Sequence, residues 1–209
     1  MRPISRCGRR SLTPELPESV GGGGLGLTEV AIVLEEIGRV AAPVPAFAVM
    51  ALAAPALAGR PELLEGVASG DVIVTAAVHE PVGDPHAPTT TVADGRITGV
   101  KVCVPHGLLA TRFVVTAADG VYCVEANDPK VRVTRQDTTS GVPDALVEFD
   151  GATASCVGGP DAVERLVALG SIGASVMVAG ACDAALRLTA DYTKSRQQFD
   201  KAIATFQAV

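Results

Sequence analysis

The pattern of hydrophobic and polar residues changes twice along the chain, and its first part has the period of a helix. After four glycines at 21–24, apolar residues recur every three or four positions, at Val30, Val33, Leu34, Ile37 and Ala41. This spacing predicts an amphipathic helix, with Thr28 as its N-cap and Pro43 at its end. We expect Glu35 and Arg39 to form an i, i+4 ion pair on the outer face of this helix.

An apolar stretch over 46–59 follows. It is shorter than the ~20 apolar residues that are needed to cross a bilayer, and Pro55 interrupts it. The stretch therefore predicts a buried helix over 46–58 rather than a membrane span. Pro61 opens a further short helix, because proline suits the first position of a helix.

From Asp71 onward the pattern becomes that of β-strands. Short runs rich in Val, Ile and Thr occupy 71–78, 96–104, 112–118, 121–126, 130–136 and 145–151. The dipeptides Asp94-Gly95 and Asp119-Gly120 each lie between two such runs, which is typical of hairpin turns. Several short strands at this spacing predict a compact antiparallel sheet or a small barrel.

From Pro160 the chain has a helical pattern again. Small and apolar residues trace one stripe, at Val163, Leu166, Val167, Gly170, Gly173, Val176, Met177, Gly180, Ala184 and Leu188. Each glycine inside a helix costs about 1 kcal/mol relative to alanine. Three glycines on one face therefore predict that another helix crosses closely there, and that the long helix belongs to a bundle.

Together these patterns predict an α+β fold with N-terminal helices, a central β domain and one long C-terminal helix from an incomplete bundle. We expect four segments along the chain. They are an irregular leader over 1–20, a partial N-terminal helical domain over 21–69, a β domain over 70–158, and the start of a C-terminal helical domain over 159–209.

Composition and charge narrow the classes of function. The formal net charge of the 209 residues is −6, which argues against a nucleic-acid partner. The five cysteines are scattered and odd in number, so a disulfide framework is not expected. We expect the protein to lie in a reducing cytoplasm. The three histidines lack a cysteine or carboxylate at ligand spacing, and we therefore expect no metal site.

The end of the chain carries the most specific motif. Arg196, Phe199, Ile203, Phe206 and Gln207 follow one another at intervals of three and four, apart from the final adjacent pair. The apolar members can anchor the segment while the guanidinium and the carboxamide project from it. Arg forms forked hydrogen bonds with phosphate, and Gln both donates and accepts. The spacing by itself also fits an amphipathic helix end whose Arg and Gln are merely solvated.

This segment resembles the R-x-x-F-x-x-x-I-x-x-F-Q signature of acyl-CoA dehydrogenases, and the order of helices, β domain and long helix is that of the same family. The resemblance covers residues 21–209. Three further stretches carry it: 24–45 resembles the helix after a Gly-Gly loop, 69–81 a first strand that ends in a T-E-P-like turn, and 96–107 the G-x-K-x-W-I-T-N strand.

The resemblance implies an FAD-dependent oxidoreductase that acts on acyl-CoA thioesters. Residues implied to bind the cofactor are Arg196, Phe199, Gln207 and His79, with Arg196 and Gln207 reaching the FAD of a neighbouring subunit. The subunits, alike or different, are expected to associate through the C-terminal helices. Neither a membrane nor nucleic acid is expected as a partner.

The chain departs from the family pattern at several positions. His79 replaces the Thr of the T-E-P turn, Cys103 replaces the Trp, and Pro105 replaces the second Thr, so a hydroxyl contact is lost. Asp200 replaces a glycine beside the expected anion site. The later helices of the family, which carry its catalytic carboxylate, have no counterpart before Val209, so we assign no catalytic residue.

Three interpretations remain open. The chain is expected to be the degenerate subunit of a heteromeric acyl-CoA dehydrogenase or a short member of the family. The alternatives are a non-catalytic interaction module, in which the long helix docks a partner, and an inactive fragment of such an enzyme. Acyl-chain specificity and the electron acceptor are not determined by these patterns.

Overall fold

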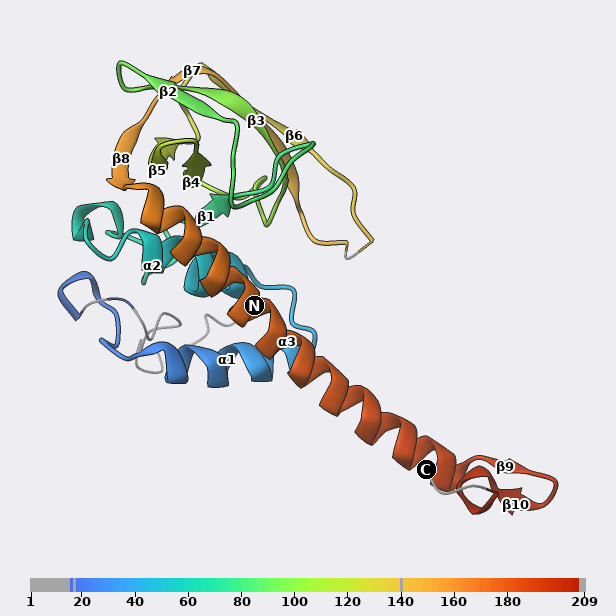
Figure 1. Cartoon of the computed structure of the whole chain (residues 1–209). Helices are drawn as coiled ribbons and strands as arrows, with labels where there is room; N and C mark the ends of the chain where they lie inside the picture. The colour runs from blue at the N-terminus through green and yellow to red at the C-terminus, as the bar shows by residue number, and fades with distance from the viewer. Residues whose placement is uncertain (1–15, 17, 140, 207–209) are drawn as a thin grey trace, which may run out of the picture.

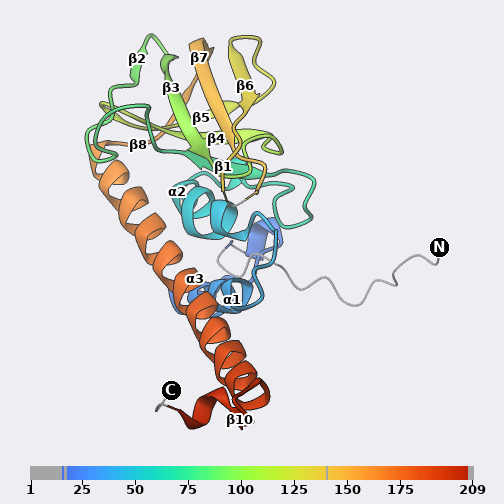
Figure 2. The same ribbon diagram turned by 90° about the vertical axis from the view of Figure 1, so that its right-hand side faces the viewer.

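The computed structural model describes residues 16, 18–139 and 141–206. Its elements follow the predicted order of helices, strands and one long helix, so the expected α+β fold is confirmed (Figure 1). The strands of the two larger sheets gather at one end of the molecule, and the shorter helices lie beside them. The long helix α3 runs past both groups and projects beyond them, as a second view also shows (Figure 2).

The first long helix, α1 (Leu27–Arg39), buries Val30, Leu34 and Gly38. The predicted cap at Thr28 is wrong, because the helix already begins at Leu27. Its first turn is instead closed by the N–H of Gly26, which donates to Glu29 Oε2 at 2.9 Å. The predicted apolar stripe also ends early, since Ala41 lies outside the helix, is exposed and has a φ of 46°.

Four short helical segments accompany α1: η1 (Glu18–Val20), η2 (Phe47–Ala53), α2 (Ala54–Ala56) and η3 (Pro61–Leu63). The run η2–α2 is the predicted apolar helix, and it is shorter than expected and begins with π-helical turns. Leu16 is only 1% exposed and packs in one hydrophobic core cluster with Leu52 of η2 and Ala54 of α2. Val20 packs against this cluster as well. The end of the predicted leader therefore belongs to the packed structure, while the segment boundaries themselves remain predictions.

Eight strands form the β region. They are β1 (Val74–Ala77), β2 (Thr91–Ala93), β3 (Arg96–Val104), β4 (Arg112–Ala117), β5 (Gly120–Glu125), β6 (Val131–Arg135), β7 (Ala145–Thr153) and β8 (Ser155–Gly158). One four-stranded sheet has the order β1-β4-β5-β8, and the other has the order β2-β3-β7-β6. The sequence pattern predicted six of these strands and missed the short edge strands β2 and β8.

Two details of the sheets differ from expectation. These eight strands form two separate sheets, so the barrel alternative is wrong. The pairing is also not purely antiparallel, because β1 and β4 run parallel, with Val74 opposite Arg112. The hairpin predicted at Asp94-Gly95 is confirmed. Its two turn residues have φ of 51° and 69°, as a type I′ turn requires.

Two layers of core hold the molecule together. Between the sheets, Phe113 and Phe149 meet edge to face with ring centroids 6.2 Å apart. The other face of the β1-β4-β5-β8 sheet packs against the helices, where Val74, Val114 and Leu166 are buried together. This sheet is therefore covered on both faces, which explains why its strands lack the alternation of a half-exposed sheet.

The long helix α3 (Pro160–Ser195) has 36 residues, and its glycine face contacts other helices as predicted. A Cβ added at Gly180 would lie 2.0 Å from the carbonyl oxygen of Glu35, and one at Gly38 would lie 2.1 Å from that of Met177. The backbones of α1 and α3 thus touch at this crossing. Gly173 faces Ala51 of η2 in the same way.

The pair predicted between Glu35 and Arg39 forms, with Arg39 Nη2 3.1 Å from Glu35 Oε1. It does not simply face outward, because Arg39 Nη1 also bonds Asp183 of α3. Arg39 is therefore part of the contact between the two helices. Beyond α3 a small hairpin of β9 (Gln197–Gln198) and β10 (Lys201–Ala202) leads into η4 (Ile203–Thr205).

Candidate functional site

A cavity of about 520 Å³ lies between the ends of β1 and β3 and the helices η2 and α3. His79, predicted to contact a cofactor, lines it together with Cys103 and Pro105. The sequence had assigned these three residues to one site through separate motifs, and the fold brings them together. The helical wall consists largely of apolar or small residues, including Phe47, Leu166 and Gly170.

A buried ion pair holds the two motifs at this cavity. Lys101 of β3 is completely buried, and its Nζ lies 2.9 Å from Oε1 of Glu80, which follows His79. The ammonium also donates to the carbonyl oxygen of Val78 at 3.3 Å and to Thr116 Oγ1 at 3.0 Å. All three of its donors therefore have acceptors, which a buried ammonium requires.

The Glu80 carboxylate is equally well satisfied. It accepts the backbone N–H groups of Thr89 and Thr90, both at 2.9 Å, and the hydroxyls of the same two residues. Burial raises the pKa of Glu80, but the hydrogen bonds from Thr89, Lys101 and Thr90 outweigh burial and bring the pKa well below its usual range. Burial lowers the pKa of Lys101, and Glu80 partly restores it. We infer that the pair is ionised at neutral pH, because every charged oxygen and N–H has a partner.

The polar groups at the cavity do not match those with which the family contacts a flavin ring. Pro105 has neither an N–H nor a hydroxyl. The N–H of Cys103 is already used, because it donates to Gln136 Oε1 at 2.6 Å. Cys103 also has a φ of 49°, a left-handed conformation that a bulky aromatic residue rarely adopts. The cavity of this chain therefore does not fit an FAD ring in the manner of the family.

At the mouth of the cavity, His86 lies on the loop between β1 and β2. Its Nδ1 is 2.7 Å from Oε2 of Glu164 in the second turn of α3. No Asp or Glu of the described residues lines the cavity itself. A carboxylate able to remove a proton from a ligand bound there must come from elsewhere.

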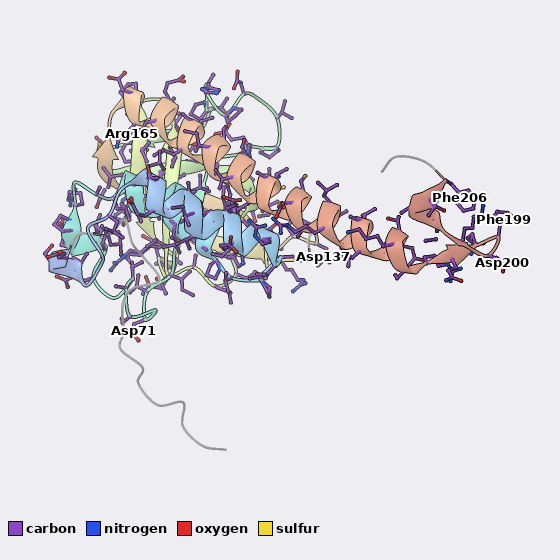
Figure 3. The ribbon with its side chains drawn as sticks, turned by 90° about the horizontal axis from the view of Figure 1, so that it is seen from below. Asp71, Asp137, Arg165, Phe199, Asp200 and Phe206 are labelled. Carbon is purple, nitrogen blue, oxygen red and sulfur yellow. The ribbon has the colours of Figure 1, made fainter. Side chains whose placement is uncertain are left out.

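The predicted residues Arg196 and Phe199 lie at the opposite end of α3. Phe199 and Phe206 are exposed there and meet edge to face with ring centroids 6.3 Å apart (Figure 3). The backbone of Arg196 is held by the hairpin, because the N–H of Ile203 donates to its carbonyl oxygen at 2.9 Å. Its guanidinium is exposed and has no hydrogen bond or ion pair to any described residue. Gln207 lies outside the described residues.

Asp200 lies at the tip of this hairpin with a φ of 60°, next to Phe199 with a φ of 51°. The glycine that the family has at this position adopts such a conformation without strain. The carboxylate of Asp200 is exposed beside the predicted anion site (Figure 3).

The cavity and the tip are far apart on one chain. Leu166 lines the cavity, and Arg196 follows it by thirty residues, nearly all of them in α3. At about 1.5 Å per residue this corresponds to about 45 Å, more than one dinucleotide can bridge. His79 and Arg196 therefore cannot contact the same cofactor within a single chain.

Sequence reasoning missed a second, smaller cavity of about 330 Å³ next to the first. Val44, Phe47, Ala174 and Met177 line it, together with His106 and Asp144. His106 is only 7% exposed. The sequence showed His106 as one of three scattered histidines, and nothing in its neighbours signalled that it would be buried.

The described residues contain no group of three His, Cys, Asp or Glu side chains that could bind a metal ion. The helix α3 is long and apolar enough to cross a membrane by length and composition alone, and 17% of its most apolar window is buried in this chain. Much of its far half is therefore an uncovered, partly apolar surface, on which Leu186 and Leu188 are 67% and 73% exposed.

Comparisons with known proteins agree on one family. Residues 9–70 match the family described as acyl-CoA dehydrogenase, N-terminal domain. Acyl-CoA dehydrogenase FadE28 of Mycobacterium tuberculosis is 38% identical, over 97% of this chain and 62% of that protein. FadE27 of the same organism is 36% identical, over 95% of this chain and 57% of that protein.

Solved structures give the same result. A chain of the ChsE4-ChsE5 complex from Mycobacterium tuberculosis is 35% identical with a TM-score of 0.84, over 92% of this chain and 57% of that chain. A chain of the Tcur3481-Tcur3483 steroid ACAD is 34% identical with a TM-score of 0.87, over 95% of this chain and 58% of that chain. The chain thus spans about three-fifths of the length of these relatives.

Proposed function

The chain belongs to the acyl-CoA dehydrogenase family, and on this premise we propose that it is one subunit of a heteromeric enzyme that dehydrogenates acyl-CoA thioesters between the α and β carbons. Arg196, Phe199 and Gln207 bind the FAD of the partner subunit. The cavity beside His79 receives the acyl group. The observation that carries the proposal is the guanidinium of Arg196, which is exposed, has no partner within residues 16, 18–139 and 141–206, and lies about 45 Å along α3 from the chain's own cavity.

Each of these residues has a limited role. The Arg196 guanidinium can bind two phosphate oxygens through forked hydrogen bonds, and Phe199, 88% exposed, provides an apolar surface beside it. Gln207 can donate and accept at once. His79 lies at the rim of the cavity, where the family has a flavin contact. An FAD bound next to the acyl group would supply the acceptor for the hydride that leaves the β carbon. Because Arg196 lies about 45 Å along α3 from this cavity, that FAD is not the one that Arg196 of the same chain contacts.

The proton acceptor comes from outside the described residues, because none of their carboxylates lines the cavity. A heteromeric arrangement is also supported by two solved relatives, whose names describe a ChsE4-ChsE5 complex and a steroid ACAD of two components. The exposed apolar residues of α3 favour protein association over a lipid contact. Asp183 and Arg187 interrupt that surface with an ion pair at 2.9 Å.

We place the protein in the cytoplasm. All four cysteines among the described residues are free thiols, at Cys103, Cys123, Cys156 and Cys182, which fits a reducing compartment. A net charge of −6 makes nucleic acid an unfavourable partner.

The test is to co-express the full chain with a candidate acyl-CoA dehydrogenase subunit and to measure flavin absorbance per complex. Arg196→Ala should reduce flavin retention. Arg165→Ala is the matched control, since Arg165 is an exposed arginine near the other end of α3 (Figure 3). Full flavin occupancy of the chain alone, or equal retention by both variants, would contradict the proposal.

A second candidate function is a non-catalytic interaction module, and the uncovered residues Val178, Leu186 and Leu188 of α3 favour it. Here the complex would form without flavin or acyl-CoA binding. Leu188→Lys would then abolish association, and Arg196→Ala would change nothing.

A further inference from the structure

His106 lies in the wall of the second cavity, at the turn between β3 and β4. Both ring nitrogens are buried, and neither has a hydrogen-bond partner among the described residues. Leaving a buried polar group without a partner costs about 1–3 kcal/mol, so an unpartnered imidazole beside a cavity suggests a ligand. Contact requires the ring to turn, and no hydrogen bond to the ring resists that turn.

The two cavities adjoin, because Phe47, Pro105 and Ala174 line both of them. A group in the larger cavity therefore lies next to the smaller one, and it reaches His106 by extending past these side chains. Around His106 the walls are mainly apolar, with Val44 and Met177 among them. His106 is thus an isolated polar contact in a mainly hydrophobic space, an arrangement that orients a ligand rather than holding it by charge.

The neutral ring of His106 and the carboxylate of Asp144 together favour neutral ligands in this cavity. Burial lowers the pKa of His106, and Asp144 partly counteracts this, so the ring is neutral at neutral pH. The carboxylate of Asp144 lies in the same wall. It accepts from the N–H of His106 at 3.3 Å and from Thr138 Oγ1 at 3.1 Å. An anionic ligand would face this carboxylate, and no Lys or Arg of the described part of the chain lines this cavity to compensate.

We propose that His106 recognises a neutral carbonyl or hydroxyl oxygen that the acyl group carries far from its thioester. This assignment rests on the proposed function for its biological meaning. It makes His106 a residue that determines substrate specificity and gives it no part in the chemical step. Either form of oxygen is suitable, because a neutral imidazole offers one donor and one acceptor.

The test uses the full chain and small ligands that need neither FAD nor coenzyme A. Cyclohexanone and methylenecyclohexane have nearly the same shape, and only the first carries the oxygen. With three histidines in the chain, the imidazole signal of His106 can be followed by NMR and assigned through His106→Asn. Asn suits the φ of 54° at this position, and thermal unfolding verifies that the variant folds.

We expect cyclohexanone to shift the His106 signal. His106→Asn should weaken cyclohexanone binding about two- to tenfold, the value of one net hydrogen bond. Methylenecyclohexane binding should change less than twofold, and Arg132→Gln, an exposed position on β6, should leave both affinities unchanged. Equal weakening of the two ligands, or no response of His106 to cyclohexanone, would overturn the assignment. Loss of flavin binding by the complex, with these results intact, would overturn only the proposed function.

Discussion

Lys101 Nζ and Glu80 Oε1 lie 2.9 Å apart in a site where the lysine side chain is fully buried and the glutamate side chain is 8% exposed. The pair joins the segment that follows β1 to β3. His79 precedes Glu80, and Cys103 follows Lys101 by two residues, so the ion pair fixes both residues at the mouth of the larger cavity. A polar contact between strands therefore determines the shape of an apolar site.

Replacing one partner of this pair should be costly and asymmetric. Glu80→Gln leaves a buried ammonium without its counter-charge, and we expect a loss of about 3–5 kcal/mol in the free energy of unfolding. Lys101→Met should cost less, because the carboxylate keeps its hydrogen bonds from Thr89 and Thr90. Urea denaturation measures both values.

The exposed pair Arg132–Glu148, with 3.6 Å between Arg132 Nε and Glu148 Oε2, provides the control. Arg132→Gln should change the free energy of unfolding by about 0–1 kcal/mol. Similar losses in all three variants would show that burial does not strengthen the Lys101–Glu80 pair.

Acid should destabilise the fold through Glu80. A carboxyl group whose pKa is lower in the folded than in the unfolded state stabilises the fold above its unfolded pKa, here about 4.5, and this contribution is lost as the pH falls below that value. Wild type should therefore lose stability more steeply between about pH 5 and pH 3 than Glu80→Gln. Parallel stability profiles of the two proteins would disprove this role.

The crossing of α1 and α3 should not tolerate a methyl group. In most helices Gly→Ala gains about 1 kcal/mol. Gly180→Ala should instead cost about 1–3 kcal/mol, as overpacking does, because the new Cβ would lie 2.0 Å from the carbonyl oxygen of Glu35. Gly59→Ala is the control, since no atom lies within 4 Å of its added Cβ. Thermal unfolding distinguishes the two, and a stabilised Gly180→Ala would show that the helices do not touch there.

Asp200→Gly should strengthen flavin binding at the hairpin that follows α3, for two reasons. Glycine removes the strain of a φ of 60°, which costs an L-residue about 1–2 kcal/mol or somewhat less for aspartate. It also removes a negative charge beside the proposed phosphate site. We expect the complex to retain more flavin, measured as absorbance after dialysis. Asp200→Asn separates the two causes, because asparagine removes the charge and keeps a side chain suited to this φ. Unchanged retention in both variants would place Asp200 outside the flavin site.

Local sequence patterns predicted the elements well. The turn at Asp94-Gly95 was predictable because a type I′ turn needs two positive φ values, which Asp-Gly provides. The glycine face of α3 indicated a crossing helix, because a glycine side chain allows two backbones to touch. Thr28 was a wrong cap because the hydrogen bond between Gly26 and Glu29 offered another closure of the first turn. The parallel pairing of β1 with β4 had no local signature either.

The sequence by itself determined the order of helices and strands and the motif at the end of α3, since both depend on spacing between near neighbours. Only the tertiary structure decided that Glu80 meets Lys101, that Arg39 reaches Asp183, and that His106 is buried beside a cavity. It also showed that Arg196 and His79 lie too far apart to share a ligand. These relationships join residues distant in the chain, and packing of the whole molecule sets them.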